Sequence, residues 1–321
     1  MYGAGGLSRK RMPKILIIKL SALGDVVRTT PLLRVLEADV TWVTCEKSCP
    51  LLVGNPFISR LCCIKRLPDS IFEESFDSVI NLEDELAPAR LATRLRKGAL
   101  MGAYFGDSGI TYTDAAREWF DLSLISKLGK SRADELKMQN RRTYQDFLFS
   151  MTGHRFEGEE YVLNTKLTRA PVAKLVGLES RAGEVWPAKR WTGYDELAKR
   201  LEGEGFTFTT FRQRETLDDY INDVNECEFV VCGDTLAMHI ALALKKKVVS
   251  IFTCTSPHEI YDYGRMKKVV SPLWEKFFYR RDFLPEAAAA IPVDAVIETM
   301  FSWEGTPLNH SLTACQQPAE P

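Results

Sequence analysis

The chain has 321 residues, of which 45% are hydrophobic and 26% charged, and its formal net charge is −1 at pH 7. The composition is that of a globular protein, and the length exceeds the size at which single cores stop growing, so two domains are expected. The near-neutral charge argues against a dedicated nucleic-acid binder, and no apolar run approaches the ~20 residues that span a bilayer. Because the N-terminus also lacks a signal-peptide core, we expect a soluble, cytoplasmic protein.

From Lys14 onward, short apolar segments alternate with helical segments, a pattern typical of parallel sheets covered by helices. In the first half we expect strands at 15–20, 40–44, 61–64, 78–82 and 99–104, and helices at 26–37, 47–53, 85–96, 113–128 and 132–152. In the second half we expect strands at 173–178, 206–211, 230–233 and 247–252, and helices at 192–203, 215–226, from about 236, from Pro257 and at 293–303.

This alternation predicts an α/β fold made of two Rossmann-like domains. We expect a disordered leader at 1–13, an N-terminal domain at 14–165, a C-terminal domain at 166–303 and a disordered tail at 304–321. Residues 161–171 are interpreted as the crossover between the domains.

Eight cysteines in a chain of this length do not indicate a disulfide scaffold. Cys45 and Cys49, with the pair Cys62 and Cys63, invite a zinc interpretation, but adjacent cysteines fit the spacing of a zinc ribbon poorly. We therefore expect neither a metal nor a cofactor.

Two strand–turn–helix segments point to a ligand site. Gly233-Asp234-Thr235 follows an apolar run and opens an apolar helix, and Asp234 or Thr235 is a candidate cap of that helix. Free amides at a helix N-terminus bind anions. The turn 21–25, which ends in Gly24-Asp25, repeats this layout after the first strand. Neither turn carries a dinucleotide or Walker fingerprint, which argues against a dehydrogenase or a nucleoside triphosphatase.

Three residues near these turns have two interpretations each. Asp25 lies where α/β sheets place ligands, but its position alone favours a helix cap over a reactive carboxylate. Lys189 is equally consistent with a surface lysine and with a point charge that meets a diphosphate. A lone histidine in an apolar helix, such as His239, is more often a core residue than a functional one.

Four motifs occur in order: KLSALGDVVRTTP at 19–31, WPxKRW at 186–191, GDTxxMHIA at 233–241 and TSPxxIxxYG at 255–264. Together they resemble glycosyltransferase family 9, the lipopolysaccharide heptosyltransferases, over most of residues 14–300. The resemblance implies a GT-B fold, with the acceptor on the N-terminal domain and the nucleotide sugar on the C-terminal one. It implies inverting transfer of a heptose, without metal, from ADP-heptose to a lipopolysaccharide-core or other lipid-linked envelope glycan.

The resemblance also assigns roles. Asp25 matches the general base, and Lys189 matches the lysine that meets the diphosphate. The residues that the resemblance places at the donor are Ser21, Ala22, Leu23, Gly24, Asp234, Thr235, Leu236, Ala237 and His239. Arg94, Arg96, Arg141 and Arg142 are candidates for an anionic acceptor, although their spacing favours a solvated helix face. Any membrane contact is expected to be peripheral, on the inner face of the cytoplasmic membrane.

Two departures from the family pattern keep other functions open. Leu236-Ala237 stands where the family usually has glycine, which limits the approach of a ligand. The interval of 45 residues from Lys189 to Asp234 is short for the strand and loop that present an acid to the nucleotide ribose, and Glu215 is the nearest substitute. The alternatives are a different nucleotide-sugar donor and a catalytically silent GT-B binding module.

Overall fold

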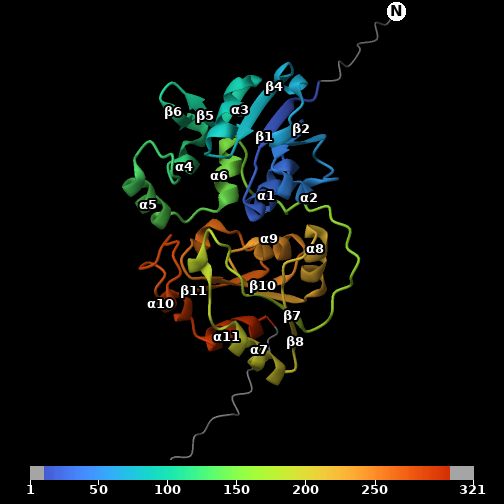
Figure 1. The fold of residues 1–321 in the computed structure, drawn as a ribbon, viewed down its shortest axis with the longest axis vertical. Helices are drawn as coiled ribbons and strands as arrows, with labels where there is room; N and C mark the ends of the chain where they lie inside the picture. Colours follow the sequence, from blue (N-terminus) through green and yellow to red (C-terminus); the bar gives the residue numbers. More distant parts are fainter. Residues whose placement is uncertain (1–10, 304–321) are drawn as a thin grey trace, which may run out of the picture.

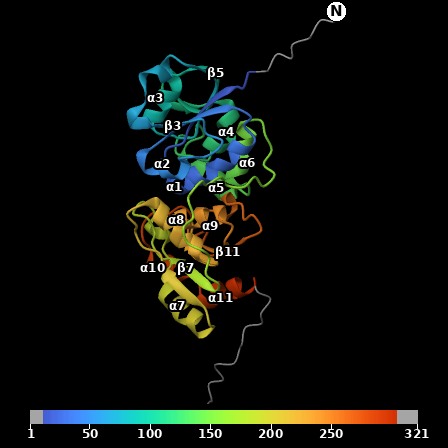
Figure 2. The same cartoon turned by 90° about the vertical axis from the view of Figure 1, so that its right-hand side faces the viewer.

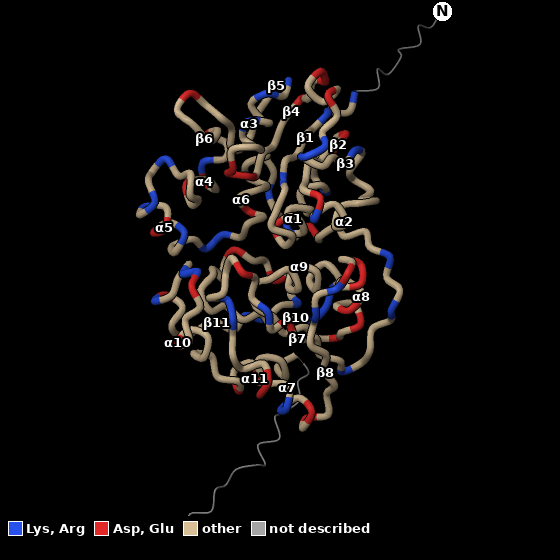
Figure 3. Tube along the Cα trace, in the orientation of Figure 1, with Lys and Arg blue, Asp and Glu red and all other residues tan. Residues whose placement is uncertain are grey.

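The computed structural model describes residues 11–303 and contains two α/β domains stacked along the long axis of the molecule (Figure 1). The segments 1–13 and 304–321, predicted to be disordered, lie outside the described residues apart from 11–13. No helix within 11–303 is long and apolar enough to cross a membrane. Figure 3 shows Lys and Arg interspersed with Asp and Glu along both domains.

The first domain contains a six-stranded sheet in the order β3-β2-β1-β4-β5-β6, parallel except for β6. Its strands are β1 (Lys14–Ile18), β2 (Asp39–Thr44), β3 (Arg60–Cys63), β4 (Ser75–Asn81), β5 (Arg96–Gly106) and β6 (Gly109–Tyr112). Its helices are α1 (Leu23–Thr29), α2 (Cys49–Leu52), α3 (Leu86–Arg94), α4 (Arg117–Phe120), α5 (Lys130–Gln139) and α6 (Tyr144–Met151). The central strand β1 is apolar from Ile15 to Ile18, as is typical of a strand whose sheet is covered by helices on both faces.

The second domain contains a five-stranded parallel sheet in the order β11-β10-β9-β7-β8. Its strands are β7 (Leu175–Glu179), β8 (Thr207–Thr210), β9 (Phe229–Gly233), β10 (Lys247–Phe252) and β11 (Met266–Val270). Its helices are α7 (Tyr194–Gly203), α8 (Leu217–Glu226), α9 (Leu236–Ala243), α10 (Pro285–Ala289) and α11 (Val293–Phe301). Residues 152–174 connect the domains without helix or strand. The boundary predicted at 165/166 falls within this segment and stays a prediction.

The two domains share one apolar core. A single cluster runs from Trp42 and Val27 in the first domain to Met238 and Ile240 in the second, because α1 packs against α9. Figure 2, like Figure 1, shows α1 at the lower border of the first domain, next to α9. Separate clusters cover the outer faces of the two sheets. The contact between α1 and α9 therefore holds the domains against each other.

Two long helices predicted from the sequence are wrong. Within 113–128 only short helical turns form, since Ser123 and Ser126 accept hydrogen bonds from backbone N–H groups two residues ahead, at 3.2 Å each. The segment 132–152 divides into α5 and α6. There, Asn140 accepts a hydrogen bond from the N–H of Arg142 at 2.9 Å, and Thr143 begins a new helix with a capping box.

The first helix is also shorter than predicted. It ends at Thr29 instead of residue 37, and a 3₁₀ helix containing Pro31 continues it to Arg34. Strands β6 and β11 and helix α10 were not predicted. Edge strand β11 carries two lysines, which mask its apolar pattern.

Candidate active site between the two domains

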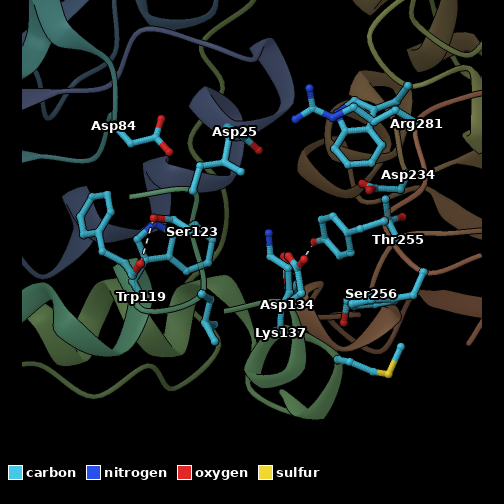
Figure 4. Close-up of a pocket in the computed structure, with 18 of the residues that line it drawn as sticks. Asp25, Asp84, Trp119, Ser123, Asp134, Lys137, Asp234, Thr255, Ser256 and Arg281 are labelled. Atoms are coloured by element: carbon cyan, nitrogen blue, oxygen red, sulfur yellow. Dashed lines mark hydrogen bonds between the residues drawn. The ribbon is translucent and has the colours of Figure 1, made fainter. Parts of the chain in front are cut away.

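A cavity of about 1070 Å³ lies between the domains and receives side chains from both (Figure 4). Its lining includes residues that follow the carboxyl ends of β1, β4, β9 and β10, the edge at which parallel α/β sheets bind ligands. Four predicted site residues line it: Ser21, Asp25, Lys189 and Asp234. Figure 4 shows Asp25 on the first domain and Asp234 on the second.

Asp25 is not the cap of its helix. Helix α1 begins at Leu23 after Ala22, so Asp25 lies within the first turn. One carboxylate oxygen, Oδ1, is 3.0 Å from Arg28 Nε, and Oδ2 is 3.9 Å from Lys19 Nζ. Burial would raise the pKa of Asp25, but the charges of Arg28 and Lys19 outweigh burial and hold this pKa below its ordinary value. Asp25 is therefore a carboxylate at neutral pH, with Oδ2 less engaged than Oδ1.

The loop that carries Asp25 is anchored by Glu83, a residue that sequence reasoning did not single out. Glu83 Oε1 accepts hydrogen bonds from the N–H groups of Leu20 at 2.6 Å and Ser21 at 3.2 Å. The same oxygen is 3.0 Å from Lys19 Nζ, and both side chains are buried. The Ser21–Ala22 peptide is cis. Glu83 thus connects the end of β4 to the turn after β1. The ammonium of Lys19 lies within 4.0 Å of the carboxylates of both Glu83 and Asp25.

Across the cavity, Lys189 and Asp234 form an ion pair. Lys189 Nζ donates to Asp234 Oδ2 at 2.8 Å and to the backbone oxygen of Asp234 at 2.9 Å. Burial alone would raise the pKa of Asp234, but the charges of Lys189 and His239 outweigh burial. The pKa of Asp234 therefore lies well below its ordinary value. The Asp234 side chain therefore does not cap α9. Thr235 occupies the N-cap position, but its hydroxyl makes no capping bond and has no partner within the described residues.

His239 lies beside the cavity and contacts the first domain. It is 3% exposed, and its Nδ1 is 3.2 Å from the Tyr161 hydroxyl. A Cβ atom on Gly24 would lie 2.7 Å from His239 Cδ2, so only glycine allows this approach between α1 and α9. Burial lowers the pKa of His239 to about 4, and Arg28 adds to the effect. The ring is therefore neutral at pH 7 and packs between the domains.

The remaining predicted donor residues lie near the cavity or away from it. Ala22, Leu23 and Gly24 form the start of α1, and Leu236 and Ala237 begin α9, but none of the five lines the cavity. Glu215 is exposed in the connection between β8 and α8, also outside the cavity.

The four predicted acceptor arginines also lie outside the cavity. Arg94 stacks on Phe72 with Cζ 4.4 Å from the ring centre, and Arg96 donates to the Glu73 carbonyl at 3.2 Å. Arg141 donates to the carbonyl of Met138 at 2.8 Å, and Arg142 pairs with a carboxylate of Glu118 at 2.7 Å. Their side chains are committed to contacts within the chain.

Several cavity residues were not found from the sequence because they come from segments without a motif. On the first domain they include Trp119, Ser123 and Lys137, and on the second Phe278, Tyr279 and Arg281. Lys137 Nζ lies 4.0 Å from the centre of the Tyr279 ring, so a cation–π contact bridges the domains at α5. Among residues 11–303, no three His, Cys, Asp or Glu side chains gather as a candidate metal site.

Comparison with known proteins agrees with this geometry. The family model of glycosyltransferase family 9 (heptosyltransferase) matches residues 212–281. Lipopolysaccharide heptosyltransferase 1 of Escherichia coli is 22% identical over 309 residues, which cover 80% of this chain and 92% of that protein. The chain is therefore similar to glycosyltransferase family 9 in both comparisons. These similarities support a glycosyltransferase.

Solved structures of this family share the fold. A family 9 glycosyltransferase from Veillonella parvula has a TM-score of 0.62 at 17% identity, covering 90% of this chain and 96% of that one. E. coli ADP-heptose lps heptosyltransferase II has a TM-score of 0.59 at 16% identity, covering 91% and 99%. E. coli heptosyltransferase WaaC with ADP-2-deoxy-2-fluoro heptose has a TM-score of 0.56 at 16% identity, covering 90% and 99%. The fold is GT-B, as the sequence motifs implied.

Proposed function

We propose that this glycosyltransferase moves a heptose from ADP-heptose to an acceptor of the lipopolysaccharide core or a related lipid-linked glycan, with inversion and without metal. The observation that carries the proposal is the placement of Asp25 opposite the Lys189–Asp234 pair across one cavity. The curated relative is a lipopolysaccharide heptosyltransferase, and one structural relative contains an ADP-heptose analogue. These supply the donor and the acceptor class of the proposal.

In the proposed reaction an acceptor hydroxyl attacks the anomeric carbon from the Asp25 side. The bond between this carbon and the diphosphate oxygen breaks, and its electron pair leaves with the diphosphate. The hydroxyl proton passes to Asp25 Oδ2, the less engaged oxygen of the carboxylate. Attack opposite the leaving group inverts the configuration of the anomeric carbon.

The low pKa of Asp25 determines when the proton moves. Arg28 makes this carboxylate a weak base, so it cannot deprotonate an isolated sugar hydroxyl ahead of the attack. The hydroxyl becomes acidic as its oxygen bonds to the anomeric carbon, and the proton transfers in the same step. Lys189 stabilises the negative charge that grows on the leaving diphosphate.

The test combines a donor panel with two variants. Wild-type protein is incubated with ADP-heptose, or with UDP-, GDP- and other ADP-sugars, and with a lipid A-type acceptor, and the product configuration is read by NMR. Asp25→Asn should lower the turnover number about 10³-fold, with little change in ADP affinity. Asp84→Asn, which removes another carboxylate from the same cavity, is the matched control and should cost much less.

Each part of the proposal has its own contrary result. Full activity of Asp25→Asn would remove Asp25 as the base. Transfer from another nucleotide sugar in preference to ADP-heptose would redefine the donor, an alternative that the position of Glu215 outside the cavity favours. The absence of thermal stabilisation by every nucleotide tested would favour a silent binding module, since a ligand at 100 times its Kd adds about 2.7 kcal/mol.

A further inference from the structure

The lysine and arginine side chains that line the cavity differ in whether a carboxylate already pairs with them. Lys19 faces Glu83, Arg28 faces Asp25 and Lys189 faces Asp234, so each already has a carboxylate within 4.0 Å. A nucleotide sugar brings negative charge on both phosphorus centres of its diphosphate. Lys189 can neutralise only part of the charge of the diphosphate, because its ammonium is already paired with the carboxylate of Asp234.

Arg281 differs from these three. It lines the same cavity, and its guanidinium has no carboxylate within 4.0 Å and no hydrogen-bond acceptor among residues 11–303. Its neighbour Arg280, by comparison, has a carboxylate oxygen of Asp282 at 3.9 Å. Figure 4 shows Arg281 extending from the second domain into the cavity. Its five N–H donors remain available to a ligand.

The backbone holds Arg281 beside Lys189. The carbonyl of Arg281 accepts a hydrogen bond from the N–H of Ala188 at 3.2 Å, and Ala188 directly precedes Lys189. The carbonyl of Ala188 in turn accepts from the Thr253 hydroxyl at 2.7 Å. The turn of Lys189 and the segment of Arg281 are thus joined to each other and to the end of β10.

One indole ring orients both cations. Arg281 Cζ lies 5.0 Å from the centre of the Trp186 ring, and Lys189 Nζ lies 5.5 Å from it. Trp186 is itself fixed edge-to-face against Tyr279, with ring centres 5.5 Å apart. A stacked guanidinium loses less conformational freedom when it binds an anion than a free one does.

We propose that Arg281 is a second diphosphate-binding residue, which acts with Lys189 as a two-cation clamp on the donor and on the leaving nucleoside diphosphate. The proposal rests on the proposed function, since it assumes a nucleotide-sugar donor in this cavity. Arg281 supplies the charge that Lys189 shares with Asp234, and its planar fork matches two phosphate oxygens. The clamp makes the affinity depend on the number of phosphates in the nucleotide.

The test measures ADP and AMP binding by calorimetry at two salt concentrations, with the UDP/UMP and GDP/GMP pairs in parallel. Arg281→Ala should weaken ADP binding about tenfold and AMP binding much less, and its ADP affinity should depend less on salt. Arg281→Lys should recover part of the loss. Arg190→Ala is the matched control, because Arg190 adjoins Lys189 but stacks on Phe283, outside the cavity.

The outcomes separate the two proposals. Equal ADP affinity in wild type and Arg281→Ala would overturn the clamp and leave the proposed function standing. An equal loss for AMP and ADP would also overturn it, because a diphosphate residue must distinguish them. Failure of the wild type to bind any nucleoside diphosphate would overturn the proposed function, and the clamp with it. An unchanged melting temperature of the ligand-free variant establishes that it is folded.

Discussion

Replacement of Gly24 by alanine tests the contact between the domains. The added Cβ would lie 2.7 Å from His239 Cδ2 and 3.4 Å from Nε2. The ring has little room to move, because it is 3% exposed and bonded to the Tyr161 hydroxyl. Overpacking of this kind costs about 1–3 kcal/mol, whereas alanine in place of a helical glycine gains about 1 kcal/mol. We expect a net loss of about 1 kcal/mol in the free energy of unfolding.

Gly203 provides a control that separates the steric clash at Gly24 from the general effect of replacing a helical glycine by alanine. Gly203 also lies in a helix, at the end of α7, but a Cβ there meets nothing within 4 Å. Gly203→Ala should therefore stabilise the protein, and urea unfolding followed by tryptophan fluorescence should separate the two variants by about 1–3 kcal/mol. His239→Ala should shrink this difference in a double-mutant cycle. If Gly24→Ala stabilises as much as Gly203→Ala, the proposed rigidity of the contact is wrong.

Three further predictions follow from the buried charges. Glu83→Gln leaves the ammonium of Lys19 without its nearest carboxylate and should lower the free energy of unfolding in urea by about 3 kcal/mol. A loss below about 1 kcal/mol would show that the carboxylate of Asp25 compensates for the missing one. Lys189→Ala should weaken ADP binding at least about tenfold by calorimetry, and unchanged affinity would place the diphosphate elsewhere. Because the pKa of His239 is about 4 when folded and 6.5 ordinarily, the unfolded chain binds the extra proton between these values. Stability should thus be full above about pH 6.5 and fall by up to ~3 kcal/mol toward pH 4. His239→Gln should flatten that part of the urea midpoint–pH profile, and an equally steep profile would contradict the assignment.

Local pattern identified most of the sheets. Strand β10 has the predicted bounds 247–252, because a strand buried on both faces is predominantly hydrophobic and does not alternate. The same reasoning failed at 113–128, where helical periodicity competes with side chains that bond the nearby backbone. The hairpin of β5 and β6 lies at a sheet edge, and its short second strand of four residues gives little pattern to detect.

Separate motifs predicted four residues of the site, but a pairing between side chains is readable from the sequence only where one motif contains both partners. Asp25 and Arg28 are three residues apart on one helix, so their pairing is readable from the sequence. Glu83 reaches the turn after β1 from 62 and 63 residues away, and the parallel pairing of β1 with β4 creates that contact. Arg281 belongs to a segment without a motif, and tertiary contacts, the hydrogen bond to Ala188 and stacking on Trp186, bring it beside Lys189.

The contact between Gly24 and His239 has a mechanical consequence for the catalytic cycle. It adjoins Asp25 in the chain and joins the domains on the inner side of the cavity, whereas Lys137 and Tyr279 join them at α5. If the domains rotate about the α1–α9 contact, atoms near this contact, such as the carboxylate of Asp25, move little. The rim of the cavity at α5 lies farther from the contact and moves more. The cavity can then widen at the α5 rim, where the Lys137–Tyr279 contact would open, while the proposed base Asp25 moves little.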